Sequence, residues 1–142
     1  MGIDAGTGSV RVALYDIKGN NLAYQIEEYG TTFPRNGWAE QDDNEWWEAL
    51  KKAIPGCIQK SGVNPEDIVA VTCDATTNTL VFLGEDGTSV RPPILWMDVR
   101  AAGEAAYIDS IRDDYEATRF YKPGFRADTM IPKCMWLKKN EP

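Results

Sequence analysis

The ten residues at positions 2–11, GIDAGTGSVR, decide the fold that this sequence predicts. Residues 2–4 have the character of a strand end, and Val10 starts a second run in which apolar and polar side chains alternate. The turn between them is short and rich in glycine, so it joins two strands without an intervening helix. It therefore differs from the Walker A loop and the GxGxxG fingerprint, which both lead from a strand into a helix.

The alternating pattern continues beyond this turn. Residues 10–16 and 22–29 both alternate, and Lys18, Gly19 and Asn20 between them suit a tight turn. The chain is therefore predicted to open on three successive antiparallel strands.

A helix and a fourth strand are expected next. Residues 42–45 carry acidic and amide side chains that favour a helix start. Pro55 lacks a backbone donor, so we expect this helix to kink or restart near Ala53 before it ends at residues 61–62. The apolar run at residues 68–73 has the length of a strand and predicts a central buried one.

The remaining elements are expected to be shorter. They are extended segments at residues 80–83 and 90–96, a helix at 101–111 capped by Asp98, and a last helix that begins at Ile131. Residues 113–129 show little periodicity. The order of elements predicts an α/β fold.

The composition narrows the classes of function. The chain of 142 residues has 15 Lys and Arg against 22 Asp and Glu, a net charge of −7, and no histidine. Without histidine there is no Ser-His or Cys-His catalytic pair, and the acidic balance argues against a nucleic-acid partner. No apolar run is long enough to cross a bilayer and the N-terminus lacks signal-peptide features, so we expect no membrane partner and a cytoplasmic location.

The turn after the first strand carries groups suited to a phosphate. They are Asp4, Gly6, Thr7, Gly8, Ser9 and Arg11. The two glycines let backbone N–H groups converge without a Cβ in the way, and the two hydroxyl residues add donors. Asp4 is placed to hold Mg²⁺ through water, and Arg11 to neutralise a phosphoryl group. A plain glycine turn with a solvated aspartate is the other interpretation of these residues.

Four ordered motifs resemble the N-terminal signatures of the FGGY carbohydrate kinases. They are residues 2–7, residues 37–42 with the tryptophans at 46 and 47, residues 94–100, and residues 132–137. The resemblance runs through the whole chain. It implies an actin-like, ribonuclease-H-like ATPase fold with a mixed sheet and flanking helices, two such domains around a cleft, and phosphorylation of a sugar or polyol hydroxyl by ATP and Mg²⁺.

The resemblance also implies roles for individual residues. It places the turn at residues 4–11 against the ATP phosphates and the metal, with Gly8 in place of a hydroxyl residue common in the family. It places a sugar or polyol ligand against Asp74, Thr77, Asn78, Trp96 and Asp98. Residues 74–76 are more similar to the ribulokinase-like branch than to glycerol kinases, which favours a pentulose. The alternatives are a polar strand end at residues 74–79 and a core role for Trp96.

Other conspicuous residues are interpreted as structural. Two of the three cysteines are expected to be buried, and all three to be reduced. The tryptophans at 38, 46 and 47 are expected to pack the first helix onto the sheet. Glu104 and Lys133 are expected to be solvated or paired at the surface.

The resemblance implies a catalytic aspartate and a nucleotide pocket beyond the matched region. We therefore expect residues 1–142 to be the N-terminal portion of the first domain, inactive alone, with an exposed strand edge that promotes self-association into a homo-oligomer. Two alternatives remain open, a non-catalytic actin-like regulatory protein and a free-standing ligand-binding domain.

Overall fold

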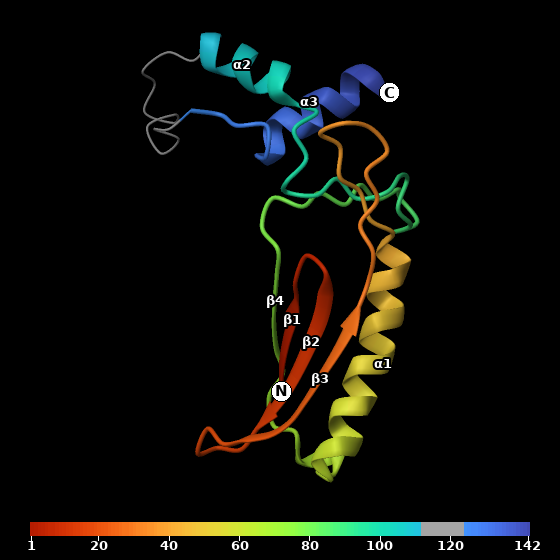
Figure 1. Cartoon of the computed structure of the whole chain (residues 1–142), viewed down its shortest axis with the longest axis vertical. Helices are drawn as coiled ribbons and strands as arrows, with labels where there is room; N and C mark the ends of the chain where they lie inside the picture. Colours follow the sequence, from red (N-terminus) through yellow and green to blue (C-terminus); the bar gives the residue numbers. More distant parts are fainter. Residues whose placement is uncertain (112–123) are drawn as a thin grey trace. The chain divides into compact units, whose positions relative to one another are not determined.

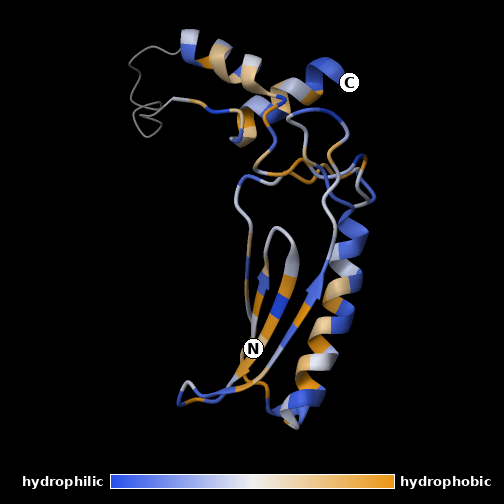
Figure 2. Ribbon diagram, in the orientation of Figure 1, coloured by the Kyte–Doolittle hydropathy of each residue, from blue (hydrophilic) through white to orange (hydrophobic). Residues whose placement is uncertain are grey.

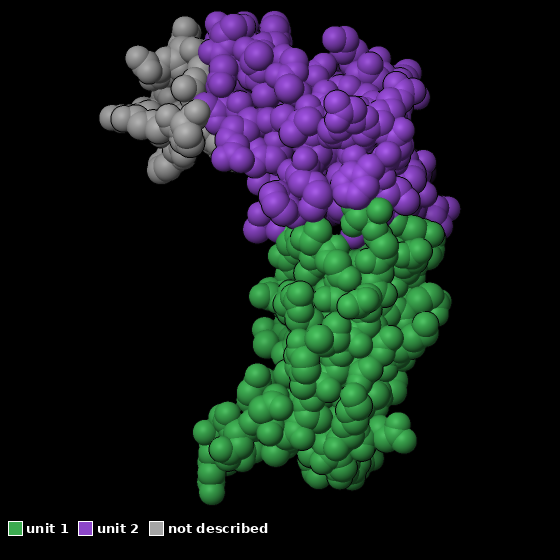
Figure 3. All heavy atoms as spheres, viewed as in Figure 1, with its two compact units in different colours: residues 1–31, 42–76 green, residues 32–41, 77–142 purple. Residues whose placement is uncertain are grey.

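The computed structural model describes residues 1–111 and 124–142 (Figure 1). These residues form two compact units (Figure 3). Unit 1 contains residues 1–31 and 42–76, and unit 2 contains residues 32–41 and 77–142.

Unit 1 is built on a four-stranded sheet. Its strands are β1 (Gly2–Ala5), β2 (Ser9–Tyr15), β3 (Asn21–Glu28) and β4 (Thr72–Ala75), in the order β3-β2-β1-β4. The first three are antiparallel neighbours, whereas β1 and β4 run parallel. The predicted opening of three antiparallel strands is confirmed.

The helix α1 (Asp43–Ser61) packs against β2 and β3. The side chain of Asp42 accepts a hydrogen bond from the backbone N–H of Asn44 at 2.9 Å, and Gly62 ends the helix in the left-handed conformation with φ 67°. Pro55 lies inside the helix without ending it, so the predicted restart near Ala53 does not occur. One helix therefore spans the whole predicted range.

The core of unit 1 lies between the sheet and this helix. Apolar residues alternate along β2 and recur along α1 (Figure 2). The buried members are Val10, Val12, Leu14, Ala23, Ala49, Ala53 and Cys57. Small side chains on the helix let it approach the sheet closely, and the strand residues supply most of the buried volume.

The prediction of a central buried strand at residues 68–73 is wrong. The strand β4 begins only at Thr72, its residues are all exposed, and Val69 retains 89% of its surface exposed. Ile68 instead closes a short 3-10 turn, Pro65–Asp67, through its N–H to the carbonyl of Pro65 at 3.2 Å. Among the described residues β4 is paired on one side only, by β1, so it forms an edge of the sheet.

The described part of unit 2 includes the helices α2 (Ala102–Ile111) and α3 (Met130–Asn140), which pack against each other. Both match the predicted positions. The predicted strands at residues 80–83 and 90–96 are reduced to isolated bridges, Leu80 with Ile94 and Leu83 with Ser89. Two consecutive prolines at 92 and 93 remove backbone donors from the second segment, which prevents a longer ladder.

Other expectations need correction. Cys57 is buried, but Cys73 and Cys134 are exposed; all three are free thiols. Trp47 is mostly exposed, and Trp38 belongs to unit 2, where its ring meets Trp136 edge-on. The predicted low-periodicity segment at 113–129 falls largely outside the described residues.

No helix in the described ranges combines the length and apolar character needed to cross a bilayer.

Candidate active site

Three charged residues occupy one level of the sheet in unit 1. Asp4 on β1 is the register partner of Arg11 on β2 and of Asp74 on β4. The Nη1 of Arg11 donates to the Oδ2 of Asp4 at 2.6 Å, and both side chains keep nearly half of their surface exposed. All three residues line one hollow of about 380 Å³ on this sheet. We refer to Asp4, Arg11 and Asp74 as the charged row.

Arg11 remains a cation in this setting. Its hydrogen bond to Asp4, followed by the charge of that carboxylate, raises the pKa of Arg11 above its usual value. The row therefore places Asp4 on the middle strand, with the cation of Arg11 on one side and Asp74 on the other. Sequence analysis assigned Asp4 and Arg11 to a phosphate and Asp74 to a sugar, and the structure brings them to one place.

The turn between β1 and β2 is tight at one glycine and open at the other. The N–H of Gly6 donates to the carbonyl of Ser9 at 3.0 Å. A Cβ at Gly6 would lie 2.8 Å from the Nη1 of Arg11, whereas a Cβ at Gly8 would meet nothing within 4 Å. A side chain at position 6 would therefore displace the end of the Arg11 side chain, whereas Gly8 leaves an open surface next to Thr7.

Tyr29 holds the turn from the end of β3. Its hydroxyl donates to the carbonyl of Gly6 at 2.5 Å, and its N–H donates to the carbonyl of Gly8 at 3.2 Å. These two hydrogen bonds hold the carbonyls of Gly6 and Gly8 toward Tyr29 and fix the shape of the turn. Burial raises the pKa of Tyr29, and the carboxylate of Asp4 raises it further, so the hydroxyl keeps its proton.

No sequence pattern pointed to Tyr29. It follows an alternating strand and precedes a glycine, which is a common setting for a solvated tyrosine. Its ring lies 6.4 Å from that of Trp46 on α1, so the helix fixes its position. The contact depends on β3 returning beside the turn, which only the fold reveals.

The donors of the charged row suit Mg²⁺ in its usual protein environment. Among the described residues no three His, Cys, Asp or Glu side chains form a metal-binding group. Mg²⁺ is commonly held by one or two carboxylates together with phosphate oxygens and water. Asp4, with Asp74 beside it in the register, matches that donor set.

The other predicted sugar contacts lie in unit 2. Thr77 and Asn78 follow the β4 segment, and Asn78 has a left-handed backbone with φ 57°. Trp96 is 42% exposed, which leaves part of its indole available to a ligand. Leu80 and Ile94 exchange backbone hydrogen bonds of 2.9 and 3.0 Å, so the segments that carry Asn78 and Trp96 are joined.

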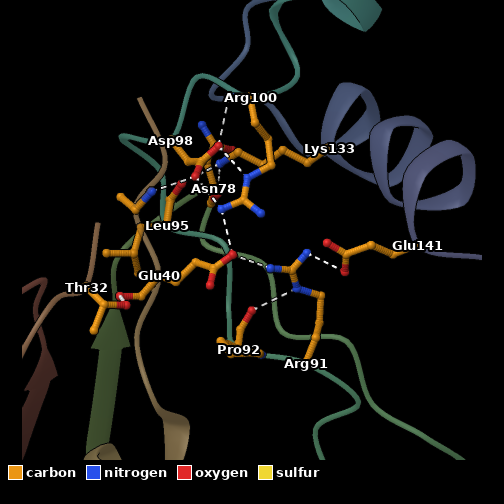
Figure 4. Close-up of polar contacts among 11 residues, drawn as sticks. Thr32, Glu40, Asn78, Arg91, Pro92, Leu95, Asp98, Arg100, Lys133 and Glu141 are labelled. Atoms are coloured by element: carbon orange, nitrogen blue, oxygen red, sulfur yellow. Dashed lines mark hydrogen bonds and ion pairs between the residues drawn. The ribbon is translucent and has the colours of Figure 1, made fainter. Parts of the chain in front are cut away.

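Asp98 does not fit its expected role. It is fully buried, and its carboxylate accepts from the N–H of Ala39 at 2.6 Å and from the Nε and Nη2 of Arg100 at 2.9 and 2.7 Å (Figure 4). Both oxygens are therefore used inside unit 2. Asp98 holds the segment in shape and is not available to a sugar hydroxyl, nor does it cap α2, which begins at Ala102.

Charges near Asp98 form a connected cluster. Arg100 also pairs with Glu40 at 2.7 Å, and Arg91 pairs with Glu40 and with Glu141. The guanidinium of Arg100 lies 3.8 Å from the centre of the Trp38 ring, which places a cation on an aromatic face. This cluster ties residues 32–41 to the segments at 91–100.

The expectation that Lys133 is solvated is wrong. Lys133 is fully buried, and its Nζ donates to the carbonyls of Asn78 and Leu95, each at 2.8 Å (Figure 4). Its sequence setting, between Pro132 and Cys134 and among apolar residues, was the available signal. Glu104, by contrast, meets the exposed Lys139 at 3.6 Å, as a surface pair would.

Comparison with known proteins gives consistent results. Residues 1–142 match the model of the N-terminal domain of the FGGY family of carbohydrate kinases. A xylulose kinase from Staphylococcus epidermidis is 30% identical over 142 residues, covering 100% of this chain and 28% of the relative. A glycerol kinase from Chloroflexus aggregans is 34% identical over 146 residues, covering 99% of this chain and 28% of the relative.

Solved structures agree with this similarity. A crystal structure of a xyloylose kinase from Brucella ovis superimposes with a TM-score of 0.89 at 28% identity, covering 99% of this chain and 29% of that one. The chain thus spans less than a third of the length of these relatives.

Proposed function

This chain belongs to the FGGY family of carbohydrate kinases, and from that membership we propose that its natural full-length protein transfers phosphate from ATP to a hydroxyl of a sugar or polyol. The observation that carries the proposal is the charged row, which sets Asp4, Arg11 and Asp74 at one level beside a glycine turn. A plain glycine turn with a solvated aspartate, the other interpretation, would not require a cation and two carboxylates around the same hollow.

We assign the phosphates of ATP to the turn between β1 and β2. Its residues in that role are Asp4, Gly6, Thr7, Gly8, Ser9 and Arg11. Phosphoryl transfer depends mainly on positioning and on stabilising the negative charge that develops on the phosphoryl group. The guanidinium of Arg11 provides a positive charge for this purpose. Tyr29 holds the carbonyls of Gly6 and Gly8 and so fixes the shape of the turn.

The metal role is assigned to Asp4, with Asp74 next to it. When bound, Mg²⁺ neutralises charge on the phosphates. The carboxylate of Asp4 also holds the guanidinium of Arg11 at 2.6 Å, so the same side chain orients the cation assigned to the phosphates.

The sugar is assigned to Asp74, Thr77, Asn78 and Trp96. Their amide, hydroxyl and carboxylate groups suit a polyhydroxylated ligand, and the exposed part of the Trp96 indole suits the C–H face of a sugar. Asp98 is left out of this set because its carboxylate is buried and fully engaged. Relatives named as xylulose kinases and as glycerol kinases are about equally similar to this chain, so similarity does not choose between their substrates. Our proposal of a pentulose rests on residues 74–76 alone.

The test is a kinase assay on the natural full-length protein with Mg²⁺ and ATP and a panel of ribulose, xylulose, ribitol and glycerol. We expect turnover with a pentulose, and a loss of about 100-fold or more in kcat/KM for Asp4→Asn. Glu66→Gln is a matched control, because Glu66 is an exposed carboxylate in the short 3-10 turn and does not line the hollow of the charged row. Normal turnover by Asp4→Asn, or no turnover with any of the four compounds, would contradict the proposal.

A further inference from the structure

A buried lysine joins the two segments to which the sugar contacts are assigned. The Nζ of Lys133, on the first turn of α3, donates to the carbonyl of Asn78 and to the carbonyl of Leu95, each at 2.8 Å (Figure 4). Asn78 is itself a proposed sugar contact, and Leu95 directly precedes Trp96. One ammonium group therefore fixes the backbone of both segments.

The conformation of Asn78 makes this contact informative. Asn78 is the only residue other than glycine with a positive φ among the described residues, at 57°. A left-handed backbone is uncommon for residues with a Cβ, although asparagine adopts it more readily than most. The hydrogen bond from Lys133 to the Asn78 carbonyl favours one orientation of that peptide group, and with it one direction of the Asn78 side chain.

The burial of Lys133 shows that this arrangement is costly to maintain. Its side chain is completely buried, and burial lowers the pKa of the ammonium to about 8, an effect that the carboxylates of Asp98 and Asp128 oppose and the charge of Arg100 reinforces. An apolar side chain of similar size would fill the same space without that cost. A role in stability alone therefore accounts poorly for a lysine at this position.

We propose that Lys133 is a positioning residue for the sugar, acting through the carbonyls of Asn78 and Leu95 to hold Asn78 and Trp96 in their binding orientations. This inference rests on the proposed function, since it concerns the same site. Lys133 does not touch the sugar, and it has no part in binding the nucleotide phosphates.

Lys133→Met is the test variant, because methionine retains the length of the stem and removes the donors. In the natural full-length protein we expect the KM for the sugar that is turned over to rise about tenfold, with the KM for ATP unchanged. Lys139→Met is the matched control, since Lys139 lies on the same helix with 75% of its side chain exposed, and both KM values should remain those of the unaltered protein. Equal changes in both KM values for Lys133→Met, or no change in either, would overturn the proposal.

A second measurement does not depend on turnover. Backbone chemical shifts of isotope-labelled chain 1–142 report the φ angle of Asn78. We expect a left-handed Asn78 in the unaltered chain and in Lys139→Met, and an extended or averaged one in Lys133→Met. If Asn78 stays left-handed without the lysine, the positioning role fails even where the kinase assay succeeds. If the kinase assay finds no substrate while Asn78 responds as expected, only the proposed function fails.

Discussion

At the scale of single residues, Tyr29 holds the turn between β1 and β2 through a hydroxyl that can be removed without removing the ring. Tyr29→Phe removes the hydroxyl that donates to the Gly6 carbonyl and leaves the ring beside Trp46 in place. We expect the KM for ATP in the natural full-length protein to rise about threefold to tenfold, because the turn assigned to the phosphates loses the hydrogen bond that holds the Gly6 carbonyl. The KM for the sugar serves as the internal control, and a change confined to that KM would contradict this role for Tyr29.

The two glycines of the turn predict opposite outcomes for the same substitution. Gly6→Ala places a Cβ 2.8 Å from the Nη1 of Arg11, so the end of the Arg11 side chain must shift against its bond to Asp4, while Gly8→Ala adds a Cβ to open space. We expect Gly8→Ala to raise the free energy of unfolding by up to about 1 kcal/mol by restricting the unfolded chain. Gly6→Ala should not be stabilising. Chemical denaturation of the two variants decides this, and equal effects would be inconsistent with the turn geometry.

Lys133 predicts a pH dependence of stability with a definite sign. Its pKa is about 8 in the folded chain and near 10.5 when exposed, so between these values the unfolded chain binds more protons. Its contribution to the free energy of unfolding is therefore smallest below pH 8 and rises by up to about 3 kcal/mol as the pH approaches 10.5. The measurement is the difference in free energy of unfolding between the unaltered chain and Lys133→Met, in which the titrations of groups common to both chains cancel. A difference that stays flat from pH 7 to 10.5 would contradict this prediction.

Residue chemistry was predictable from sequence where contacts are local and not where they are distant. The turn between the first two strands could be predicted because its glycines and the flanking strand residues are neighbours along the chain. The roles of Asp98 and Lys133 depend on partners such as Ala39 and Asn78, which lie 59 and 55 positions away. The same side chains at a surface would have been solvated, so residue type alone did not determine the outcome.

At the scale of elements, local patterns predicted the helices better than the strands. The helix α1 begins and ends where its capping residues Asp42 and Gly62 predict. An apolar run, however, indicates only that a segment can pack against other residues. Among the described residues no strand lies on the outer side of residues 68–71. Single backbone bridges join Glu40 to Ile94 and Ile94 to Leu80. The sequence shows no hydrophobic periodicity that would predict them.

The exposed edge at β4 predicts self-association of chain 1–142. Thr72 and Thr76 donate toward β1, to Met1 and Ala5, so by the alternation of a parallel ladder the N–H groups of Cys73 and Ala75 point to the outer side. Such an edge pairs readily with another copy. We expect light scattering under reducing conditions to show concentration-dependent dimers or larger species.

Ala75→Pro tests the route of this association. Proline removes an outward donor without removing a bond to β1, so the variant should remain monomeric at concentrations where the unaltered chain associates. Thr72→Pro is the contrasting variant, because it removes the bond to Met1 and should destabilise the β1–β4 pair. A monomeric unaltered chain at high concentration, or equal association of Ala75→Pro, would exclude the β4 edge as the contact.

At the scale of the whole molecule, the family could be inferred from sequence because its motifs are spread along the chain in order. Residues 2–7, 37–42, 94–100 and 132–137 fall in both units. The division into units could not be inferred, since unit 2 takes up residues 32–41 from within the sequence of unit 1. Motif order therefore identified the family while leaving the arrangement of the site open.

Chain 1–142 is predicted to lack kinase activity when it is alone. The charged row is the proposed phosphate and metal site, and none of its residues is proposed to remove the proton from the accepting hydroxyl. The chain spans 28% of the length of its xylulose kinase relative. Without a base and a closed site, positioning alone gives little acceleration. We expect chain 1–142 to show no sugar-dependent ADP release with ribulose or xylulose under conditions where the natural full-length protein turns over. Release above the level of Asp4→Asn in the same chain would mean that these residues already contain the catalytic base.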